Sequence, residues 1–325
     1  MVAEESCLVA LLRLVDRVPL AEAPPRRGRP PLYADRLFLK ALVVMIVRRL
    51  PKVQTLLSIL DEPTTEMQQL RGLLSEHGRF PSRRTWERRL GRIPQTLPAQ
   101  IGCLGRYLVG VLAPWPHGGR AAAIDSTVLR ACDGVWHRKH REAGVVPHTS
   151  IDTEAAWTKS GWHGWVYGWK LHLVTTVAGV WIPLAATLTP ANRADNQEAH
   201  SLLAELPAEV GFLLGDTHYN DPAVRERCTA AGRELVATKR GPYPHTDGGV
   251  EVRRIFHQLR SHAIENFNSQ FKGIFECGGQ VPTRGMRATR RFILGAVFVY
   301  QLTLLYRFET GGDLRVGLKA FLRAA

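Results

Sequence analysis

The sequence predicts an α/β fold, in which a mixed sheet is flanked by helices and preceded by a small all-helical region. Residues 1–118 show helical periodicity only, and Gly118 and Gly119 break the chain where that pattern stops. After them the pattern runs strand, hairpin, helix, strand, helix, strand and helix, which is typical of a sheet with helices on its faces. We therefore expect a helical region at 1–118, an α/β domain at 119–310 and a C-terminal tail at 311–325.

The charge of the chain favours a polyanionic partner. The chain has 43 Lys and Arg side chains against 29 Asp and Glu, which gives a formal net charge of +14. The basic excess lies at the two ends, with 19 basic against 10 acidic side chains in residues 1–120, 12 against 14 in 121–250 and 12 against 5 in 251–325. Two basic flanks around a slightly acidic centre suggest a nucleic acid held from both ends. The alternative is a merely basic globular protein.

Cysteine usage and hydropathy predict an intracellular protein. No cysteine pair has the close spacing of a zinc site, and a disulfide framework is not expected. We interpret the five cysteines as buried thiols in a reducing compartment: Cys7, Cys103, Cys132, Cys228 and Cys277. No signal peptide precedes Arg13, and the longest apolar run, residues 292–306, is short for a membrane span and is bounded by arginines. We expect no membrane partner and a cytoplasmic, nucleoid-associated location.

The helical region ends in an arginine-rich helix. Apolar helices are expected over residues 35–50 and 53–60, and Thr65 is a candidate N-cap of the next helix. Ser82 is a candidate N-cap of the last one, which carries four arginines: Arg83, Arg84, Arg88 and Arg89. Short helices ending in an arginine-rich one fit a helix-turn-helix reader, with these arginines near phosphates or base edges of DNA. A solvated basic face is the alternative.

A Pro- and Arg-rich segment, residues 24–31, lies within the helical region. Its Arg27-Gly28-Arg29-Pro30 core resembles the hooks that lay arginines into the narrow minor groove of A·T-rich DNA. Arg27 and Arg29 are therefore candidate DNA contacts. A Pro-rich basic linker is the alternative.

The α/β domain is expected to contain elements of both periods. A polar stretch rich in His and Arg, residues 132–161, is expected to form a loop that meets DNA. The regular elements are a strand over 121–130, a hairpin over 165–189, a helix over 195–206, a strand over 211–216, a helix opened by Asp221 and Pro222, a strand over 234–238, a long helix holding Glu265 and a last helix over 287–307.

Three acidic residues on separate elements suggest a metal site. Asp125 interrupts an apolar strand, and Asp216 ends a second strand at the position where ligand sites in α/β sheets gather. A buried carboxylate needs protonation, a partner or a metal. Glu265 could supply a third carboxylate from a helix packed beside the strands. Such a set suits Mg²⁺ or Mn²⁺, and two ions about 4 Å apart would activate a water or 3′-hydroxyl for displacement at phosphorus.

The helix around Glu265 also carries a polar stripe. Glu265, Asn268 and Lys272 lie three and four residues apart, so they share one edge of the helix beside its apolar face. A carboxylate, an amide and an ammonium on one edge suit a surface that faces both a metal and a phosphodiester. The usual alternative is a solvated helix face.

Three segments carry a resemblance to a known family. Residues 124–127 (Ile-Asp-Ser-Thr), 214–221 (Leu-Gly-Asp-Thr-His-Tyr-Asn-Asp) and 264–272 (Ile-Glu-Asn-Phe-Asn-Ser-Gln-Phe-Lys) resemble the three acidic signatures of bacterial insertion-sequence DDE transposases. The most similar branch is the IS4/IS5-like one. Residues 168–174 and 190–196 are similar to the stretch that these enzymes carry between the first two acids.

The resemblance implies an RNase H-like core in which Asp125, Asp216 and Glu265 are the catalytic residues and the ligands of two divalent ions, Mg²⁺ or Mn²⁺. It implies cleavage and strand transfer at the terminal inverted repeats of an insertion sequence, in double-stranded DNA, by a homodimer that also engages target DNA. Further DNA contacts would come from four side chains: Lys170, Arg260, Asn268 and Lys272.

Two features depart from the family pattern. Ser261 occupies the place of the usual Arg and Gln258 the place of the usual Tyr, while Arg260 lies one residue early. Only 49 residues separate Asp216 from Glu265, too few for the large β insertion of some relatives, on which a hairpin or base-flipping step would depend.

Two rival functions stay open. One is a catalytically silent, transposase-derived DNA-binding regulator, against which the intact acids argue. The other is an RNase H-like nuclease or resolvase, which would not need the large basic N-terminal region. Asp133, Asp152 and Asp195 are further candidate metal ligands, but loop acids and helix caps explain them more simply.

Overall fold

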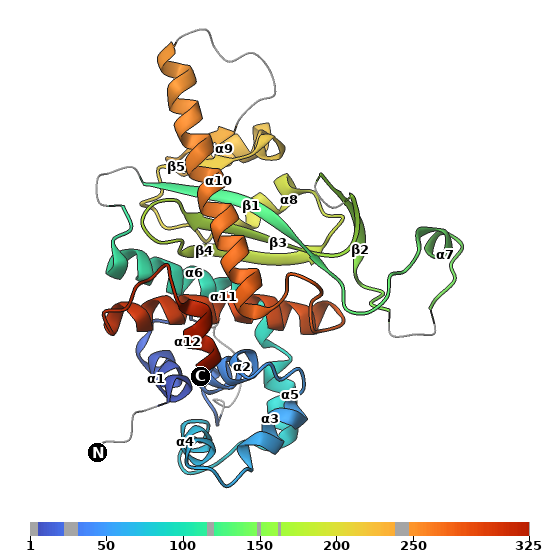
Figure 1. The fold of residues 1–325 in the computed structure, drawn as a ribbon, viewed down its shortest axis with the longest axis vertical. Helices are drawn as coiled ribbons and strands as arrows, with labels where there is room; N and C mark the ends of the chain where they lie inside the picture. Colours follow the sequence, from blue (N-terminus) through green and yellow to red (C-terminus); the bar gives the residue numbers. More distant parts are fainter. Residues whose placement is uncertain are drawn as a thin grey trace.

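The computed structural model describes residues 6–22, 32–115, 120–147, 151–161, 164–237 and 247–324. The Pro- and Arg-rich segment that holds Arg27 and Arg29 lies outside the described residues, as does the pair Gly118 and Gly119. Short N-terminal helices gather at one end of the molecule, and the sheet with its long covering helix forms the rest (Figure 1).

Among the described residues, six strands form a mixed sheet: β1 (Ala121–Arg130), β2 (Ala156–Ser160), β3 (Gly164–Thr176), β4 (Pro183–Pro190), β5 (Phe212–Gly215) and β6 (Glu234–Ala237). β1 pairs antiparallel with β3 and parallel with β5, and β5 pairs parallel with β6. β2 and β4 share the other edge of β3. The resulting order β4-β3-β1-β5-β6 is the RNase H-like arrangement, so the expected fold class is confirmed.

One long helix, α10 (Asp247–Phe275), crosses the sheet over β1 and β5 (Figure 1). Helical spacing places its buried apolar side chains on one stripe: Ile264, Phe267, Phe271 and Ile274. Arg260 of the same helix reaches Asp125 of β1, so Asp125 points to the face that α10 covers.

A second helix, α8 (Asp195–Leu203), covers the opposite face. Lys170 and His172 of β3 pair with Val128 and Ser126 of β1, and these positions alternate with Asp125 along the strand. Both side chains contact Asp195, the first residue of α8. The α8 side of the sheet therefore lies directly behind the strand segment that carries Asp125.

The helix α11 (Met286–Glu309) is buried along most of its length and joins the two parts of the protein. It packs against β4 and against three other helices: α1 (Cys7–Arg17), α2 (Asp35–Val47) and α6 (Ile93–Leu112). At Gly295 a Cβ would lie 3.1 Å from Leu42 and 3.2 Å from Ile46, so glycine permits the close approach of α2. Of the described helices, α11 alone is long and apolar enough to cross a membrane, and 78% of that stretch is buried inside the protein.

The arginine-rich helix predicted from the sequence is α5 (Arg83–Leu90), and it follows α3 (Val53–Leu60) and α4 (Thr65–Leu73). The Ser82 hydroxyl accepts a hydrogen bond from the Thr85 amide, so the predicted N-cap is confirmed. For α4 the prediction was wrong by one residue, because Thr64 is the N-cap and accepts from the Met67 amide.

Four elements were not expected from the sequence: α6, β2, α7 (Arg138–Glu142) and α12 (Leu318–Ala324). α12 lies where a C-terminal tail was expected, and it packs on α10 and α1. Arg323 of α12 pairs with Glu276, which also pairs with Arg49 after α2, so the end of α10 is tied to α12 and to the end of α2.

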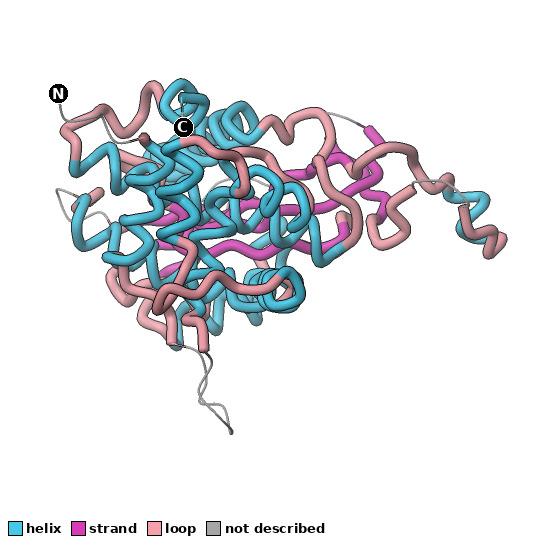
Figure 2. Tube along the Cα trace, turned by 90° about the horizontal axis from the view of Figure 1, so that it is seen from below, coloured by secondary structure: helices cyan, strands magenta, loops and turns pink. Residues whose placement is uncertain are grey.

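The stretch between β1 and β2 is an arm that projects beyond the sheet and carries α7 (Figures 1 and 2). The Trp136 indole N–H donates to the Val145 carbonyl at 3.0 Å, and the Trp157 indole N–H donates to the Trp136 carbonyl at 2.7 Å. Arg141 lies over the Trp136 ring. Two tryptophans therefore hold the base of an arm whose basic side chains are exposed.

Candidate active site

Two of the predicted acids meet at the end of a parallel strand pair. The last paired residues of β1 and β5 are Ala123 and Leu214. Asp125 and Asp216 each lie two residues further on, so the parallel register sets them side by side where β5 ends. The charge of Asp216 acts on the Asp125 carboxyl, which agrees with this placement.

Asp125 is a half-buried carboxylate with two protein partners. Its Oδ1 accepts from the Ser126 amide at 2.7 Å, and its Oδ2 accepts from the Arg260 guanidinium at 3.3 Å. Burial raises the pKa of Asp125 to about 6, and Arg260 and the Ser126 amide oppose this rise. The charges of Asp216 and Asp195 raise the pKa further, so ionising Asp125 adds negative charge to an already negative centre.

This pKa gives an expected pH dependence for Asp125→Asn. The folded protein holds the Asp125 proton up to about pH 6, above the ordinary value of 3.8, so ionisation costs the wild type stability as the pH rises through this interval. Asparagine has no such loss. In EDTA, the free energy of unfolding of the variant relative to wild type should increase between pH 4.5 and pH 7 by on the order of 1–2 kcal/mol, measured in urea.

Asp133→Asn is the matched control. A hydrogen bond from Arg284 lowers the pKa of this exposed acid, so its contribution is present above the ordinary pKa and is lost in acid. Between pH 4.5 and pH 7 this acid is ionised in both the folded and the unfolded protein, so the stability difference between the control and wild type should stay nearly constant. If the difference in free energy of unfolding between Asp125→Asn and wild type did not change with pH, burial would not raise the pKa of the Asp125 carboxyl.

Asp216 begins a short turn that is held at both ends. Its Oδ1 accepts from the His218 amide at 2.8 Å and caps the 3-10 turn η1 (Thr217–Tyr219). Asp221 then caps α9 (Pro222–Ala230) by accepting from the Ala223 amide at 2.9 Å, as predicted from the Asp-Pro pair. The two caps fix the loop that carries Asp216.

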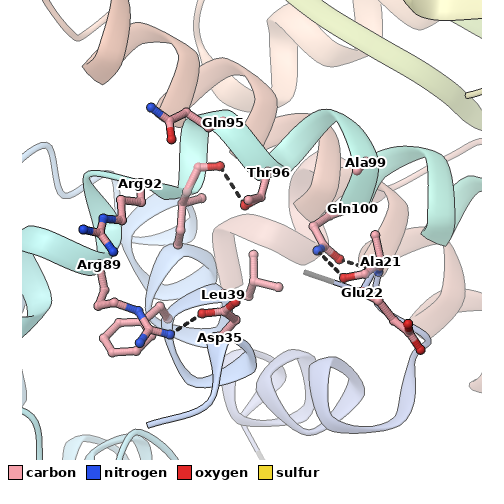
Figure 3. Close-up of a pocket in the computed structure, with 12 residues that line it drawn as sticks. Ala21, Glu22, Asp35, Leu39, Arg89, Arg92, Gln95, Thr96, Ala99 and Gln100 are labelled. Atoms are coloured by element: carbon pink, nitrogen blue, oxygen red, sulfur yellow. Dashed lines mark hydrogen bonds and ion pairs between the residues drawn. The ribbon is translucent and has the colours of Figure 1, made fainter. Parts of the chain in front are cut away.

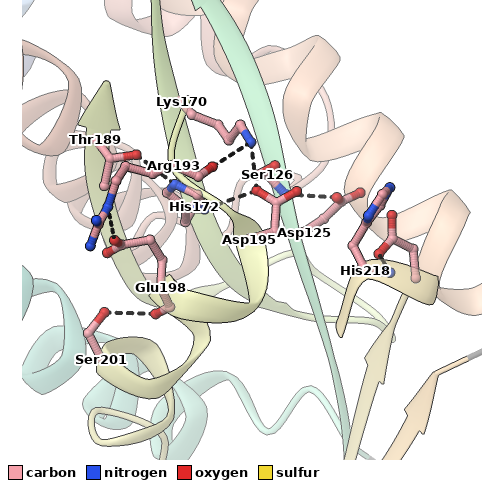
Figure 4. Close-up of polar contacts among 11 residues, drawn as sticks. Asp125, Ser126, Lys170, His172, Thr189, Arg193, Asp195, Glu198, Ser201 and His218 are labelled. Atoms are coloured by element: carbon pink, nitrogen blue, oxygen red, sulfur yellow. Dashed lines mark hydrogen bonds and ion pairs between the residues drawn. The ribbon is translucent and has the colours of Figure 1, made fainter. Parts of the chain in front are cut away.

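A buried polar network lies behind Asp125 (Figure 4). The Lys170 ammonium donates to Asp195 Oδ1 at 3.0 Å and to the Arg193 carbonyl at 2.9 Å. His172 contacts Thr189 Oγ1 through Nε2 at 2.8 Å, and burial lowers the pKa of His172 to about 4, with Asp195 opposing. This histidine is therefore neutral at pH 7. Lys170, predicted to contact DNA, has a structural role here as the partner of Asp195.

The α10 residues predicted for the site have different surroundings. Arg260 contacts Asp125, whereas Glu265 is exposed five residues later, about 7.5 Å further along the helix axis. Asn268 is half-buried, and its Oδ1 has no hydrogen-bond partner among the described residues. Burial lowers the pKa of Lys272. The structure thus brings α10 to the acids through Arg260.

The donor chemistry of this centre fits a hard divalent cation in part. Asp125 and Asp216 offer carboxylate oxygens only, which Mg²⁺ and Mn²⁺ prefer, and a guanidinium already provides positive charge at Asp125. Within the described part of the chain, no three His, Cys, Asp or Glu side chains form a group that could hold a metal ion. Glu265 as a third ligand therefore stays a prediction.

The α5 arginines divide into two kinds. Arg83, Arg84 and Arg88 are exposed, and Arg83 pairs with Glu87 along the helix. Arg89, also predicted to contact DNA, is 9% exposed, pairs with Asp35 and lies over the Phe38 ring at 4.4 Å. Its guanidinium anchors α5 to α2. We therefore restrict the DNA-contact prediction on this helix to the three exposed arginines.

A pocket of about 310 Å³ lies beside Arg89, away from the acids (Figure 3). Gln100 of α6 crosses it, accepting from the Ala21 amide at 2.9 Å and donating to the Ala21 carbonyl at 3.0 Å. Arg92 and Glu22 also line it. The paired backbone contacts indicate that Gln100 holds the chain after α1 against α6.

Two residues near the acids were not assigned to the site from the sequence. Asp195 was interpreted as a cap, yet its charge acts on Asp125 across the sheet. Tyr219 was quoted only as part of a motif, yet it is fully buried and the charges of Asp125, Asp195 and Asp216 all act on its hydroxyl. The sequence feature that could have pointed to Tyr219 is its place three positions after Asp216, the acid at the end of a strand.

Comparison with known proteins identifies the family. Residues 116–302, more than half of the chain, match the family described as the transposase DDE domain. No curated protein matched. Solved structures similar to this chain include a piggyBac transposase synaptic complex with hairpin DNA (9% identity, TM-score 0.41, 97% of this chain and 76% of that chain) and a pre-cleavage Mos1 transpososome (12% identity, TM-score 0.23, 86% and 80%). These scores are too low to support an argument. On the strength of the family match, the chain belongs to the transposase DDE domain family.

Proposed function

We propose that this protein binds the terminal inverted repeats of an insertion sequence and catalyses metal-dependent DNA cleavage and strand transfer. The observation that carries the proposal is the pair Asp125 and Asp216, set side by side on neighbouring parallel strands of a DDE domain. The family supports a transposase. The bacterial origin, the IS4/IS5-like branch and the inverted-repeat substrate are part of the proposal, as is a cytoplasmic, nucleoid-bound location.

We propose Asp125, Asp216 and Glu265 as the catalytic and metal-binding residues, with two Mg²⁺ or Mn²⁺ ions. When bound, such ions activate a water or a 3′-hydroxyl and stabilise the leaving oxygen at phosphorus. Asp125 and Asp216 would hold the ions from the sheet, and Glu265 would join them from α10. Arg260 screens the charge between the acids in their absence, because it pairs with Asp125.

DNA is the proposed partner at two surfaces. Lys272 and Asn268 would contact phosphates further along α10, and the exposed arginines of α5 would read the inverted repeat. Two transposon ends require two sets of acids, so a homodimer assembled on DNA is proposed. The formal net charge of +14 on the chain supports a polyanionic partner such as DNA.

The test is a cleavage and strand-transfer assay on DNA that carries the inverted repeats flanking the gene. Nicking at the repeat ends and joining to a second duplex should appear with Mg²⁺ or Mn²⁺ and disappear with EDTA. Repeat-specific binding without cleavage under either ion would identify the catalytically silent regulator instead. Cleavage without preference for the repeats would identify a nuclease.

The α5 surface is tested by Arg84→Ala combined with Arg88→Ala. Both side chains are exposed, so the fold should be unaffected. Loss of two phosphate or base contacts should weaken binding of the repeat by about 10- to 100-fold and reduce the salt dependence of log K by about 2, measured by fluorescence anisotropy. Arg227→Ala, on α9 at the opposite end of the molecule (Figure 1), is the control and should bind normally. Equal binding by both variants would contradict the assignment of α5.

A further inference from the structure

The hydroxyl of Tyr219 is buried without a hydrogen-bond partner. Tyr219 ends the turn that Asp216 caps, and its side chain is 0% exposed. Among the described residues, no atom accepts from or donates to its hydroxyl. A buried hydroxyl in this state costs stability, so its position calls for a physical reason.

The charges that act on this hydroxyl are those of the candidate active site. The carboxylate with the largest effect on it is Asp125, followed by Asp195 and Asp216, and the Arg260 guanidinium opposes them. These groups come from β1, α8, the end of β5 and α10. Burial, followed by the three carboxylates, raises the pKa of Tyr219 well above its usual value. The hydroxyl therefore keeps its proton at pH 7 and is available as a donor.

The local backbone is arranged to admit the ring. At Gly215, the last residue of β5, an added Cβ would lie 2.9 Å from the Tyr219 Cβ and 3.2 Å from its ring atoms. Any larger residue at 215 would displace the tyrosine from the strand end. Glycine before Asp216 thus permits the tyrosine ring to pack against the end of β5.

The neighbouring acids already have other donors. Asp125 accepts from the Ser126 amide and from Arg260, and Asp216 accepts from the His218 amide. The Tyr219 hydroxyl contributes to none of these contacts. The Tyr219 hydroxyl can therefore donate a hydrogen bond to an oxygen atom of a ligand that binds at the acids.

We propose that Tyr219 is a positioning residue of the active site, whose hydroxyl donates a hydrogen bond to an oxygen bound together with a divalent cation at Asp125 and Asp216. The oxygen belongs to a water or to a DNA phosphate. This inference rests on the proposed function and extends it to a residue with no acidic or basic role. It also gives a reason for a buried hydroxyl that has no hydrogen-bond partner among the described residues.

The test is Tyr219→Phe, which removes the hydroxyl and keeps the ring. In EDTA the variant should unfold at the same temperature as wild type or higher, because the buried hydroxyl has no partner to lose. With Mn²⁺ or Mg²⁺ alone, the stabilisation seen for wild type should need about tenfold more ion. DNA added with the ion distinguishes the two oxygen sources: a deficit that appears without DNA indicates a water, and one that appears only with DNA indicates a phosphate.

Tyr300→Phe is the matched control. Tyr300 is equally buried on α11, but its hydroxyl donates to Gln270 Oε1 at 3.1 Å, and burial alone raises its pKa. The control should unfold at a lower temperature than wild type and respond to the ion like wild type. In EDTA the unfolding temperature should fall for Tyr300→Phe but not for Tyr219→Phe. This difference separates a buried hydroxyl with a hydrogen-bond partner from one without.

The outcomes separate this inference from the proposed function. If wild type is stabilised by the ions and Tyr219→Phe responds identically with and without DNA, the role of Tyr219 is overturned while the proposed function stands. If wild type itself shows no response to either ion with or without DNA, both are overturned. A lower unfolding temperature for Tyr219→Phe in EDTA also overturns the inference, because the hydroxyl would then have a partner in the metal-free protein.

Discussion

Asp216→Asn is expected to reduce the rate of strand cleavage by at least about a thousandfold while DNA binding and folding stay unchanged. The replacement keeps the size of the side chain, and its oxygen can still accept from the His218 amide and cap the turn. The negative charge beside Asp125 is lost, and with it the ability to hold a divalent cation between two strands. Cleavage is measured on labelled inverted-repeat DNA, and binding by anisotropy.

Asp221→Asn is the control for this prediction. It lies five residues further along the same loop, where its carboxylate caps α9 and accepts from the Asn196 side chain. An asparagine can retain the cap, so the control should cleave at close to the normal rate. A folded Asp216→Asn protein that cleaves like wild type would remove Asp216 from the proposed catalytic set.

Gly168→Ala should lower the free energy of unfolding by about 3 kcal/mol or more. An added Cβ would overlap the Leu129 carbonyl and lie 2.9 Å from the Ala131 amide and 3.0 Å from the Arg130 Cα. All three are backbone atoms at the end of β1 or directly after it. β2 pairs with the other edge of Gly168, so neither strand can move away without breaking its ladder. Urea unfolding, followed by circular dichroism, measures the loss.

Gly72→Ala provides the comparison. This glycine lies inside α4, and nothing lies within 4 Å of a Cβ built on it. Alanine should therefore stabilise the helix by about 0.5–1 kcal/mol. If Gly168→Ala were as stable as wild type, the three-strand junction at the end of β1 would be looser than its geometry implies.

The sequence predicted the elements whose periodicity is clear. The bounds of β1 and α3 agree with the prediction, because an apolar run marks β1 and helical spacing of apolar residues after Pro51 marks α3. A shared site for Asp125 and Asp216 could also be expected, because Asp125 interrupts one apolar strand and Asp216 ends another in an α/β pattern. The region that became α6 was not assigned from the sequence. It contains Pro94 and Pro98, and Pro94 lies in the first turn, where proline is tolerated.

Side-chain partners were beyond the reach of the pattern. The sequence of a helix with four arginines does not indicate which arginine faces inward. Arg89 does so because it pairs with Asp35 and packs over the Phe38 ring, both on α2. Asp195 and Tyr219 reach the acids through contacts between elements far apart in the chain. Such contacts depend on how the sheet and helices pack, which local periodicity does not encode.

The buried helix α11 has a consequence for how such a protein would choose its cut. Because α11 packs against both the N-terminal helices and β4, the helices that include α5 and the strands that carry the acids share one hydrophobic core. If a flexible linker joined the DNA-binding helices to the catalytic domain, the DNA backbone could be cut at several offsets from the recognised bases. In a chain built like this one, the distance between the DNA-reading helix and the acids would be fixed, so the cut would fall at a single offset from the recognised bases.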